Sequence, residues 1–144
     1  MADIKLTLPA EYGWIVLVIV ASFVMIMWLG SRVGVARKKY EVKYPKMYIE
    51  PYNHVFNCIQ RAHLNTLEGY PTFLVFIVFG GLIYPRLNAI AGVIWVAARV
   101  AYAMGYYTGD PEKRMWGAFG YIGLLIMLVS NIILGLKLLG VVAM

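Results

Sequence analysis

The chain has 144 residues, of which 62% are hydrophobic and only 14% are charged, and it carries a net charge of +6. So few polar side chains cannot cover a water-soluble domain of this size, which indicates a membrane protein. The positive charge is concentrated in connections between apolar segments, so nucleic acid is not an expected partner.

Two uncharged runs, 12–31 and 115–136, are long enough to cross a bilayer. A hydrocarbon core of about 30 Å needs about 20 residues of helix. We therefore expect a first helix over approximately 12–34 and a fourth over approximately 113–138. The first run is too long for the core of a signal peptide, and its basic residues follow it, so we expect it to remain as a membrane anchor.

The second helix is predicted from two prolines. Pro71 and Pro85 enclose only thirteen residues, which as a helix would cover roughly 20 Å, too short to span. The helix must therefore begin upstream of Pro71, over approximately 55–84, with Pro85 setting a tight turn after it. A third helix is predicted over approximately 88–107, interrupted by the single charge of Arg99. The predicted fold is all-α, an integral membrane four-helix bundle forming one domain over 1–144.

Basic residues are distributed unevenly between the two sides of this bundle. The first and third connections hold Arg32, Arg37, Lys38, Lys39, Lys43, Lys46, Lys113 and Arg114. The opposite side holds only Lys5, Arg86 and Lys137. Because cytosolic loops are enriched in Lys and Arg, we expect the first and third loops to face the cytosol. Anionic lipid headgroups near the first loop are an incidental partner.

A polar stripe runs along the predicted second helix. Its members are Asn57, Arg61, Asn65 and Glu68. At about 100° per residue they fall within roughly 80° of one another, on one face of a helix. The third helix repeats the pattern with Arg99, Tyr102 and Tyr106. A charge facing lipid costs about 2.5–3.5 kcal/mol near a helix centre, so both stripes should face the inside of the protein.

Two interpretations of the stripes are open. In the first, Arg61, Glu68 and Arg99 pair with one another and hold the helices together. In the second, the surplus of two arginines over one glutamate binds an anion, with Arg37, Lys38 and Arg114 adding positive charge at the same end. The second interpretation predicts a small ligand that bears carboxylates and a positive group for Glu68. No cluster with metal-ligand spacing is present, so no metal is expected.

Three segments resemble a known family. R-A-H-L-N-T-L-E-G-Y-P (61–71) and A-R-V-A-Y-A-M-G-Y-Y-T-G-D-P-E-K-R (98–114) are similar to the membrane-associated proteins in eicosanoid and glutathione metabolism (MAPEG). F-N-C-I-Q-R-A-H (56–63) resembles the microsomal glutathione S-transferase 3 branch of that family. The resemblance implies a homotrimer in the endoplasmic reticulum membrane, or alternatively the outer mitochondrial membrane. It also implies glutathione as cosubstrate, bound between adjacent subunits on the cytosolic side.

The resemblance also implies roles for individual residues. The implied glutathione contacts are Arg61, Asn65, Glu68, Tyr102 and Tyr106, with Arg37 or Lys38 supplied by a neighbouring subunit. Arg114 resembles the arginine that faces the glutathione sulfur, with Lys113 as the alternative, and Arg99 resembles a buttress of Glu68. Gly69 stands where some leukotriene-forming relatives carry tyrosine, which leaves one ligand contact and leukotriene C4 synthesis in question.

The activity implied by the resemblance is that of a glutathione transferase and peroxidase. Its substrates would be lipophilic electrophiles such as leukotriene A4, together with fatty-acid hydroperoxides. An alternative is a scaffold that presents lipid to another enzyme without chemistry of its own. A channel or transporter subunit has less support, because the polar stripes occupy only one half of their helices.

Overall fold

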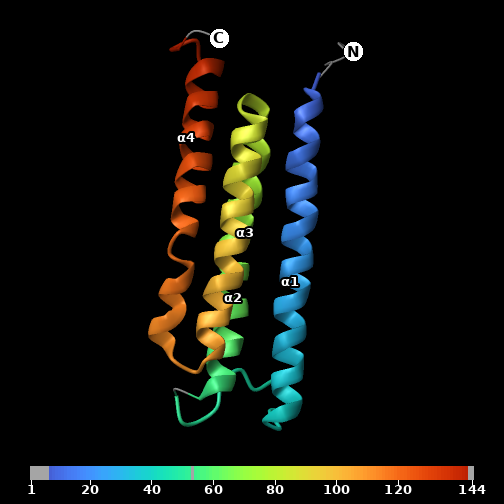
Figure 1. Ribbon diagram of the computed structural model, residues 1–144, viewed down its shortest axis with the longest axis vertical. Coiled ribbons are helices and arrows are strands. Elements are labelled where there is room, and N and C mark those ends of the chain that lie inside the picture. The colour runs from blue at the N-terminus through green and yellow to red at the C-terminus, as the bar shows by residue number, and fades with distance from the viewer. Residues whose placement is uncertain (1–6, 53, 143–144) are drawn as a thin grey trace.

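The computed structural model describes residues 7–52 and 54–142, and in this part of the chain all regular structure is helical. Four long helices lie side by side (Figure 1): α1 (Gly13–Lys39), α2 (Val55–Ile83), α3 (Pro85–Tyr107) and α4 (Gly120–Leu138). Two short 3-10 helices, η1 (Ala10–Tyr12) and η2 (Pro111–Gly117), precede α1 and α4. All four long helices are long and apolar enough to cross a membrane. The predicted fold class is confirmed.

The helix boundaries follow local backbone chemistry. Helix α2 begins at Val55 and continues through Pro71, while α3 begins directly at Pro85. Proline suits the first position of a helix because its missing N–H would have no partner there. Its predecessor Tyr84 adopts φ −133° and ψ 70°, outside the α region that a following proline disfavours. Residues 111–117 form η2, separate from α4, so the segment around Arg114 is a distinct element.

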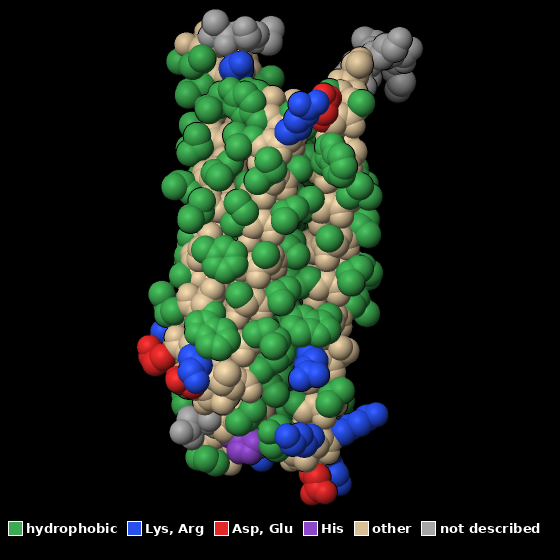
Figure 2. Space-filling model, viewed as in Figure 1, with side chains coloured by type: hydrophobic (Ala, Val, Ile, Leu, Met, Phe, Trp, Pro, Cys, Tyr) green, Lys and Arg blue, Asp and Glu red, His purple; other side chains and the backbone are tan. Residues whose placement is uncertain are grey.

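The bundle has two different ends. The described termini lie together at one end, here called the terminal end (Figure 1). Loop 1 (40–54) and η2 lie at the other, here called the loop end. Figure 2 shows a belt of hydrophobic side chains between the ends, with the Lys, Arg, Asp and Glu side chains of this face gathered at the ends. This distribution matches a bilayer-spanning bundle.

Close packing between the helices depends on small residues. Gly123 of α4 lies directly against the backbone carbonyl of Ala91 on α3, and Gly92 of α3 lies against Ile77 of α2. A side chain at either glycine would collide with these neighbours. Phe73 and Trp95 stack nearby with ring centroids 4.1 Å apart. Association of helices in lipid relies on such van der Waals contact, which explains Gly120 and Gly123 of α4, both packed on α3.

A network of amide side chains ties α2, α3 and α4 together near the terminal end. The Nδ2 group of Asn88 donates to the carbonyls of Gly80 and Tyr84, each at 3.0 Å, and to the hydroxyl of Ser130 at 3.1 Å. Asn131 donates to the carbonyls of Phe76 and Met127, both at 2.8 Å. These two asparagines and Ser130 are called the terminal-end network below. Interhelical hydrogen bonds of this kind contribute about 0.6 kcal/mol each on average.

Candidate functional site

The polar stripe of α2 forms an ion pair near the loop end. Arg61 donates to Glu68 through two bonds, from Nη1 to Oε1 at 2.8 Å and from Nη2 to Oε2 at 3.2 Å. Their side chains remain 42% and 56% exposed. The Nδ2 group of Asn65 lies 3.5 Å from Glu68 Oε2. Arg61 and Glu68 therefore pair with each other, as the first interpretation of the stripes predicted. The pair lies within α2, so it does not join two helices, and both side chains remain accessible.

Arg99 of α3 joins this pair through neutral side chains. Its Nη2 group donates to Asn65 Oδ1 at 2.8 Å and to Thr66 Oγ1 at 2.7 Å, and Nε donates to Thr66 Oγ1 at 3.0 Å. Its guanidinium also lies 4.1 Å from the centre of the Tyr102 ring. Within residues 7–52 and 54–142, Arg99 forms no ion pair with a carboxylate. It therefore reaches Glu68 only through Asn65, and its positive charge is not neutralised there.

A cavity of about 640 Å³ opens beside this network at the loop end. Six residues singled out from the sequence line it: Asn57, Arg61, Asn65, Tyr102, Tyr106 and Arg114. Glu68 and Arg99 line an adjoining cavity of about 340 Å³ that shares Asn65 with the first. The first cavity is the candidate site, since three separate elements, α2, α3 and η2, bring cations, an amide and phenols to it.

Arg114 reaches the cavity because η2 packs tightly on α3. Gly105 of α3 lies directly against the backbone carbonyl of Lys113, an approach that a side chain would block. Asp110 caps the start of η2 by accepting a hydrogen bond from the Glu112 amide at 3.0 Å. The neighbouring Tyr106 side chain raises the pKa of Arg114 above its ordinary value. Arg114 therefore stays cationic at any physiological pH.

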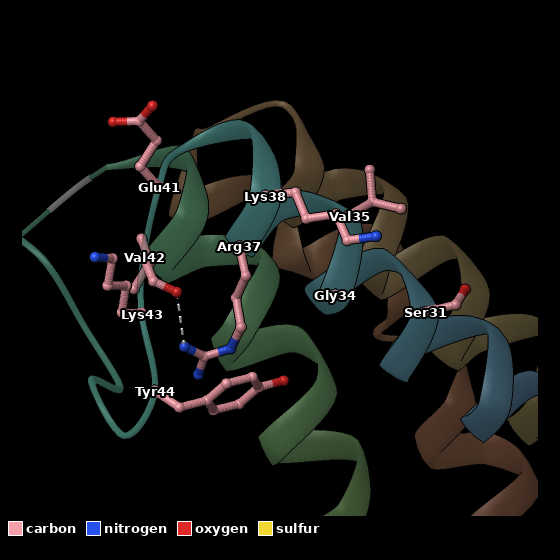
Figure 3. A pocket seen from close by; sticks show the side chains of 9 residues that line it. All are labelled: Ser31, Gly34, Val35, Arg37, Lys38, Glu41, Val42, Lys43 and Tyr44. Atoms are coloured by element: carbon pink, nitrogen blue, oxygen red, sulfur yellow. Dashed lines mark hydrogen bonds between the residues drawn. The ribbon is translucent and has the colours of Figure 1, made fainter.

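Arg37 and Lys38 lie elsewhere in the same chain. They border a separate cavity of about 850 Å³ where α1 meets loop 1 (Figure 3). Arg37 is buried, and its Nη1 group donates to the carbonyls of Lys46 at 2.9 Å and Val42 at 3.4 Å. Its guanidinium lies over the ring of Tyr44, 4.3 Å from the ring centre. The Lys38 side chain is exposed. A glutathione contact from either residue across a subunit boundary stays a prediction.

Loop 1 adds two cavity residues that the sequence did not indicate. Tyr48 and Tyr52 line the candidate site together with residues of α2, α3 and η2. Asn57, a member of the predicted polar stripe, lines the same cavity and also holds loop 1. Its Oδ1 accepts from the Ile49 amide at 2.9 Å, and its Nδ2 donates to the carbonyls of Ile49 at 2.7 Å and Tyr52 at 2.9 Å. The available signal was Tyr48 between Pro45 and Pro51, together with Tyr52 directly after Pro51.

The chemistry of the site follows from its donor set. Guanidinium, amide and phenol groups bind carboxylates, while a single carboxylate, Glu68, offers a partner for an amine. Arg114 at the mouth can stabilise a nearby anion. Among the described residues, no group of three or more His, Cys, Asp or Glu side chains lies close enough to hold a metal ion.

Comparison with known proteins shows which proteins this chain is similar to. Residues 15–133 match the model of the MAPEG family. The chain is 34% identical over 128 residues to the uncharacterized protein sll1147 of Synechocystis sp., covering 85% of this chain and 88% of that relative. It is 34% identical to microsomal glutathione S-transferase 2 of Mus musculus (72% and 69% covered) and 30% identical to that of Bos taurus (70% and 67% covered). With its four spanning helices, this chain belongs to the MAPEG family of membrane proteins.

Proposed function

We propose that the protein is a glutathione-dependent membrane enzyme, a glutathione transferase and peroxidase acting on lipophilic electrophiles. The observation that carries the proposal is the candidate site itself. Its cavity lies at the end of an apolar bundle and is lined by Arg61 of an accessible ion pair, while the unneutralised Arg99 lines the adjoining cavity. The two relatives named microsomal glutathione S-transferase 2 support the choice of cosubstrate.

Glutathione fits the charges of the site. It carries two carboxylates, an amine and a thiol, and its γ-glutamyl end is zwitterionic. The exposed pair of Arg61 and Glu68 offers a positive and a negative group side by side, which suits a carboxylate and an amine on the same carbon. Asn65 and the tyrosines of α3 add hydrogen bonds. In the homotrimer that we propose, Lys38 or Arg37 of a neighbouring subunit would hold the second carboxylate.

In this proposal Arg114 stabilises the thiolate form of glutathione. A thiol with a reference pKa of about 8.5 is mostly protonated at neutral pH, and an adjacent guanidinium lowers that pKa. Each unit of lowering favours the thiolate, which is the nucleophile, by about 1.4 kcal/mol. Lys113 is a weaker candidate for this role because its Nζ lies 3.9 Å from Asp110 Oδ2.

The thiolate supports two reactions. With an epoxide, a sulfur–carbon bond forms, a carbon–oxygen bond breaks and the oxygen takes up a proton. With a lipid hydroperoxide, sulfur attacks the terminal oxygen and the O–O bond breaks, leaving an alcohol and a sulfenic acid. A second glutathione then reduces the sulfenic acid to a disulfide and water. The lipophilic substrate would enter from the bilayer between α1 of one subunit and α4 of the next.

Gly69 affects the activity that we expect toward leukotriene A4. It lies directly after Glu68, and nothing lies within 4 Å of where its side chain would begin. A tyrosine there, as in some leukotriene-forming relatives, would have room to reach the ligand. We therefore expect leukotriene A4 to be a slower substrate than a lipid hydroperoxide.

The direct test uses one purified sample in detergent. Glutathione is supplied with leukotriene A4 in one reaction and with a fatty-acid hydroperoxide in another, and products are measured by mass spectrometry. Glutathione-dependent product in either reaction supports an enzyme. Saturable glutathione binding without product in both would favour the lipid-presenting scaffold instead. The endoplasmic reticulum location that we propose is checked separately by fluorescence microscopy of the tagged full chain.

A further inference from the structure

Loop 1 closes one side of the candidate site, and its position is fixed by two side chains of the neighbouring helices. We propose that residues 46–52, called the loop-1 wall below, are part of the ligand site. In this proposal Tyr48 donates a hydrogen bond to a carboxylate of the ligand, and Asn57 is the positioning residue that holds the wall in place. The inference rests on glutathione being the ligand.

The first anchor is the Asn57 amide. It is only 5% exposed, and it pairs with both the N–H and the C=O of Ile49, as a neighbouring strand would. A third bond reaches the carbonyl of Tyr52. Pairing both groups of one residue fixes the direction of the backbone as well as its position. The Ile49 side chain packs against the buried cluster that includes Phe56 and Ile59.

The second anchor is Arg37, at the other end of the loop-1 wall. Its Nη1 group donates to the Lys46 carbonyl at 2.9 Å. The guanidinium is held between aromatic rings, with ring centres at 4.3 Å for Tyr44 and 5.4 Å for Phe56. Only Met47 and Tyr48 separate the residues fixed by the two anchors, Lys46 and Ile49. So short a segment has little freedom to move away from the cavity.

This arrangement places a phenol beside Arg61. Tyr48 adjoins the Arg61 side chain on the cavity wall, and its own side chain remains accessible. Arg61 uses Nη1 and Nη2 to bind Glu68 from within α2. A carboxylate that approaches Arg61 from the cavity therefore comes within reach of the Tyr48 hydroxyl. A phenol O–H donating to a carboxylate forms a short, charge-assisted hydrogen bond.

Removing the Tyr48 hydroxyl tests the ligand contact. We expect Tyr48→Phe to weaken glutathione binding about tenfold, as for a lost hydrogen bond to a charged group. The matched control is Tyr84→Phe, because Tyr84 is exposed and lies in the turn between α2 and α3, outside the candidate site. Dissociation constants are measured by equilibrium dialysis of the detergent-solubilised full chain. Binding by Tyr48→Phe within about twofold of wild type would overturn the ligand role.

Limited proteolysis tests the anchor independently of any ligand. Asn57→Leu keeps the approximate shape but removes all three hydrogen bonds to loop 1. We expect trypsin to cleave after Lys43 and Lys46 about tenfold faster in this variant, since cleavage follows local opening. Asn131→Leu is the control, because it removes a comparable amide from the terminal-end network. Equal cleavage of wild type and Asn57→Leu would overturn the anchor.

Kinetics separate positioning from general destabilisation. In Asn57→Leu we expect the KM for glutathione to rise about tenfold while kcat at saturating glutathione stays within about twofold, because Asn57 does not touch the reacting atoms. Asn131→Leu should leave both constants unchanged. If the wild-type chain does not bind glutathione at all, the proposed function and the Tyr48 contact both fail. The proteolysis result then still decides whether Asn57 holds the loop-1 wall.

Discussion

The two ends of the bundle use polar side chains in different ways. At the terminal end, Asn88 is fully buried and its Nδ2 donates to the backbone carbonyl of Gly80 on α2 and to Ser130 of α4. At the loop end, Asn65 accepts from Arg99 at 2.8 Å and has only a long contact of 3.5 Å for its Nδ2 group. The same residue type is enclosed at one end and faces a cavity at the other.

This difference separates polar residues that hold the helices together from polar residues that are available to bind a ligand. A polar group inside a membrane is stabilised by a partner, and at the terminal end such partners serve the N–H groups of Asn88, whose Oδ1 accepts no hydrogen bond from the described residues. The loop end holds more charge than its internal pairs neutralise, and its side chains line cavities of about 640 and 340 Å³. The ion pairs differ in what they connect, because Arg86–Glu11 joins α3 to η1 whereas Arg61–Glu68 lies within α2 beside the site; both pairs are exposed.

The largest effect should come from Arg114. We expect Arg114→Ala to lower turnover about 100-fold, as when one charge-stabilising donor is removed from an active site, with the glutathione dissociation constant nearly unchanged. Steady-state rates with saturating glutathione measure it. Lys113→Ala is the control and should retain activity. If Lys113→Ala instead loses turnover and Arg114→Ala does not, the assignment of the two residues is reversed.

Arg99 should have the next largest effect, on binding. Arg99→Leu removes the unneutralised cation and releases Asn65, so we expect about tenfold to thirtyfold weaker glutathione binding. Arg86→Leu removes an arginine at the terminal end and serves as the comparison. Isothermal titration of both variants in the same detergent gives the ratio. Equal loss in the two variants would mean that positive charge anywhere on the protein, and not the site, governs affinity.

The pH dependence of turnover should shift by a smaller amount. Because Arg114 stabilises the thiolate, the bound thiol should have a pKa below its reference of about 8.5, and the rate should level off at lower pH than without it. Removing the cation raises the thiol pKa, so the Arg114→Ala profile should move to higher pH by about one unit. The raised pKa of Arg114 keeps its own titration outside this range. Superimposable pH profiles of wild type and Arg114→Ala would show that Arg114 does not stabilise the thiolate.

The smallest effect on function should come from the terminal-end network. Asn88→Leu should lower the free energy of unfolding by about 1–2 kcal/mol, because it removes three hydrogen bonds that each contribute modestly. Glutathione affinity should stay within about twofold of wild type. Thermal unfolding followed by intrinsic fluorescence measures the first quantity and dialysis the second. A large loss of affinity would show that the two ends are coupled.

Helical periodicity predicted much of this architecture from the sequence. The four spanning helices follow from uncharged runs and proline positions. The meeting of Arg61, Asn65, Tyr102 and Tyr106 at one cavity follows from their spacing on two helices. Such features depend on the fixed rotation per residue of a helix, so residue spacing alone is enough to predict them.

Features set by tertiary contacts were not predictable in the same way. Thr66, next to the stripe, accepts a hydrogen bond from Arg99. This pairing depends on how α2 and α3 are offset along their axes, which periodicity does not specify. The roles of Arg37 and Asn57 depend on the path of loop 1, a segment without helical pattern. The seating of η2 on α3 involves the close approach of Gly105 to the Lys113 carbonyl, a contact between elements that periodicity does not specify.

Glutathione binding by two matched charge variants tests the central claim most directly. Glu68→Gln and Glu11→Gln each remove one carboxylate that pairs with an arginine, the first at the loop end and the second at the terminal end. Equilibrium dialysis with labelled glutathione should show saturable binding by the wild type, about tenfold weaker binding by Glu68→Gln and unchanged binding by Glu11→Gln. No saturable binding by the wild type, or equal affinity in all three proteins, would contradict a glutathione site at the loop end.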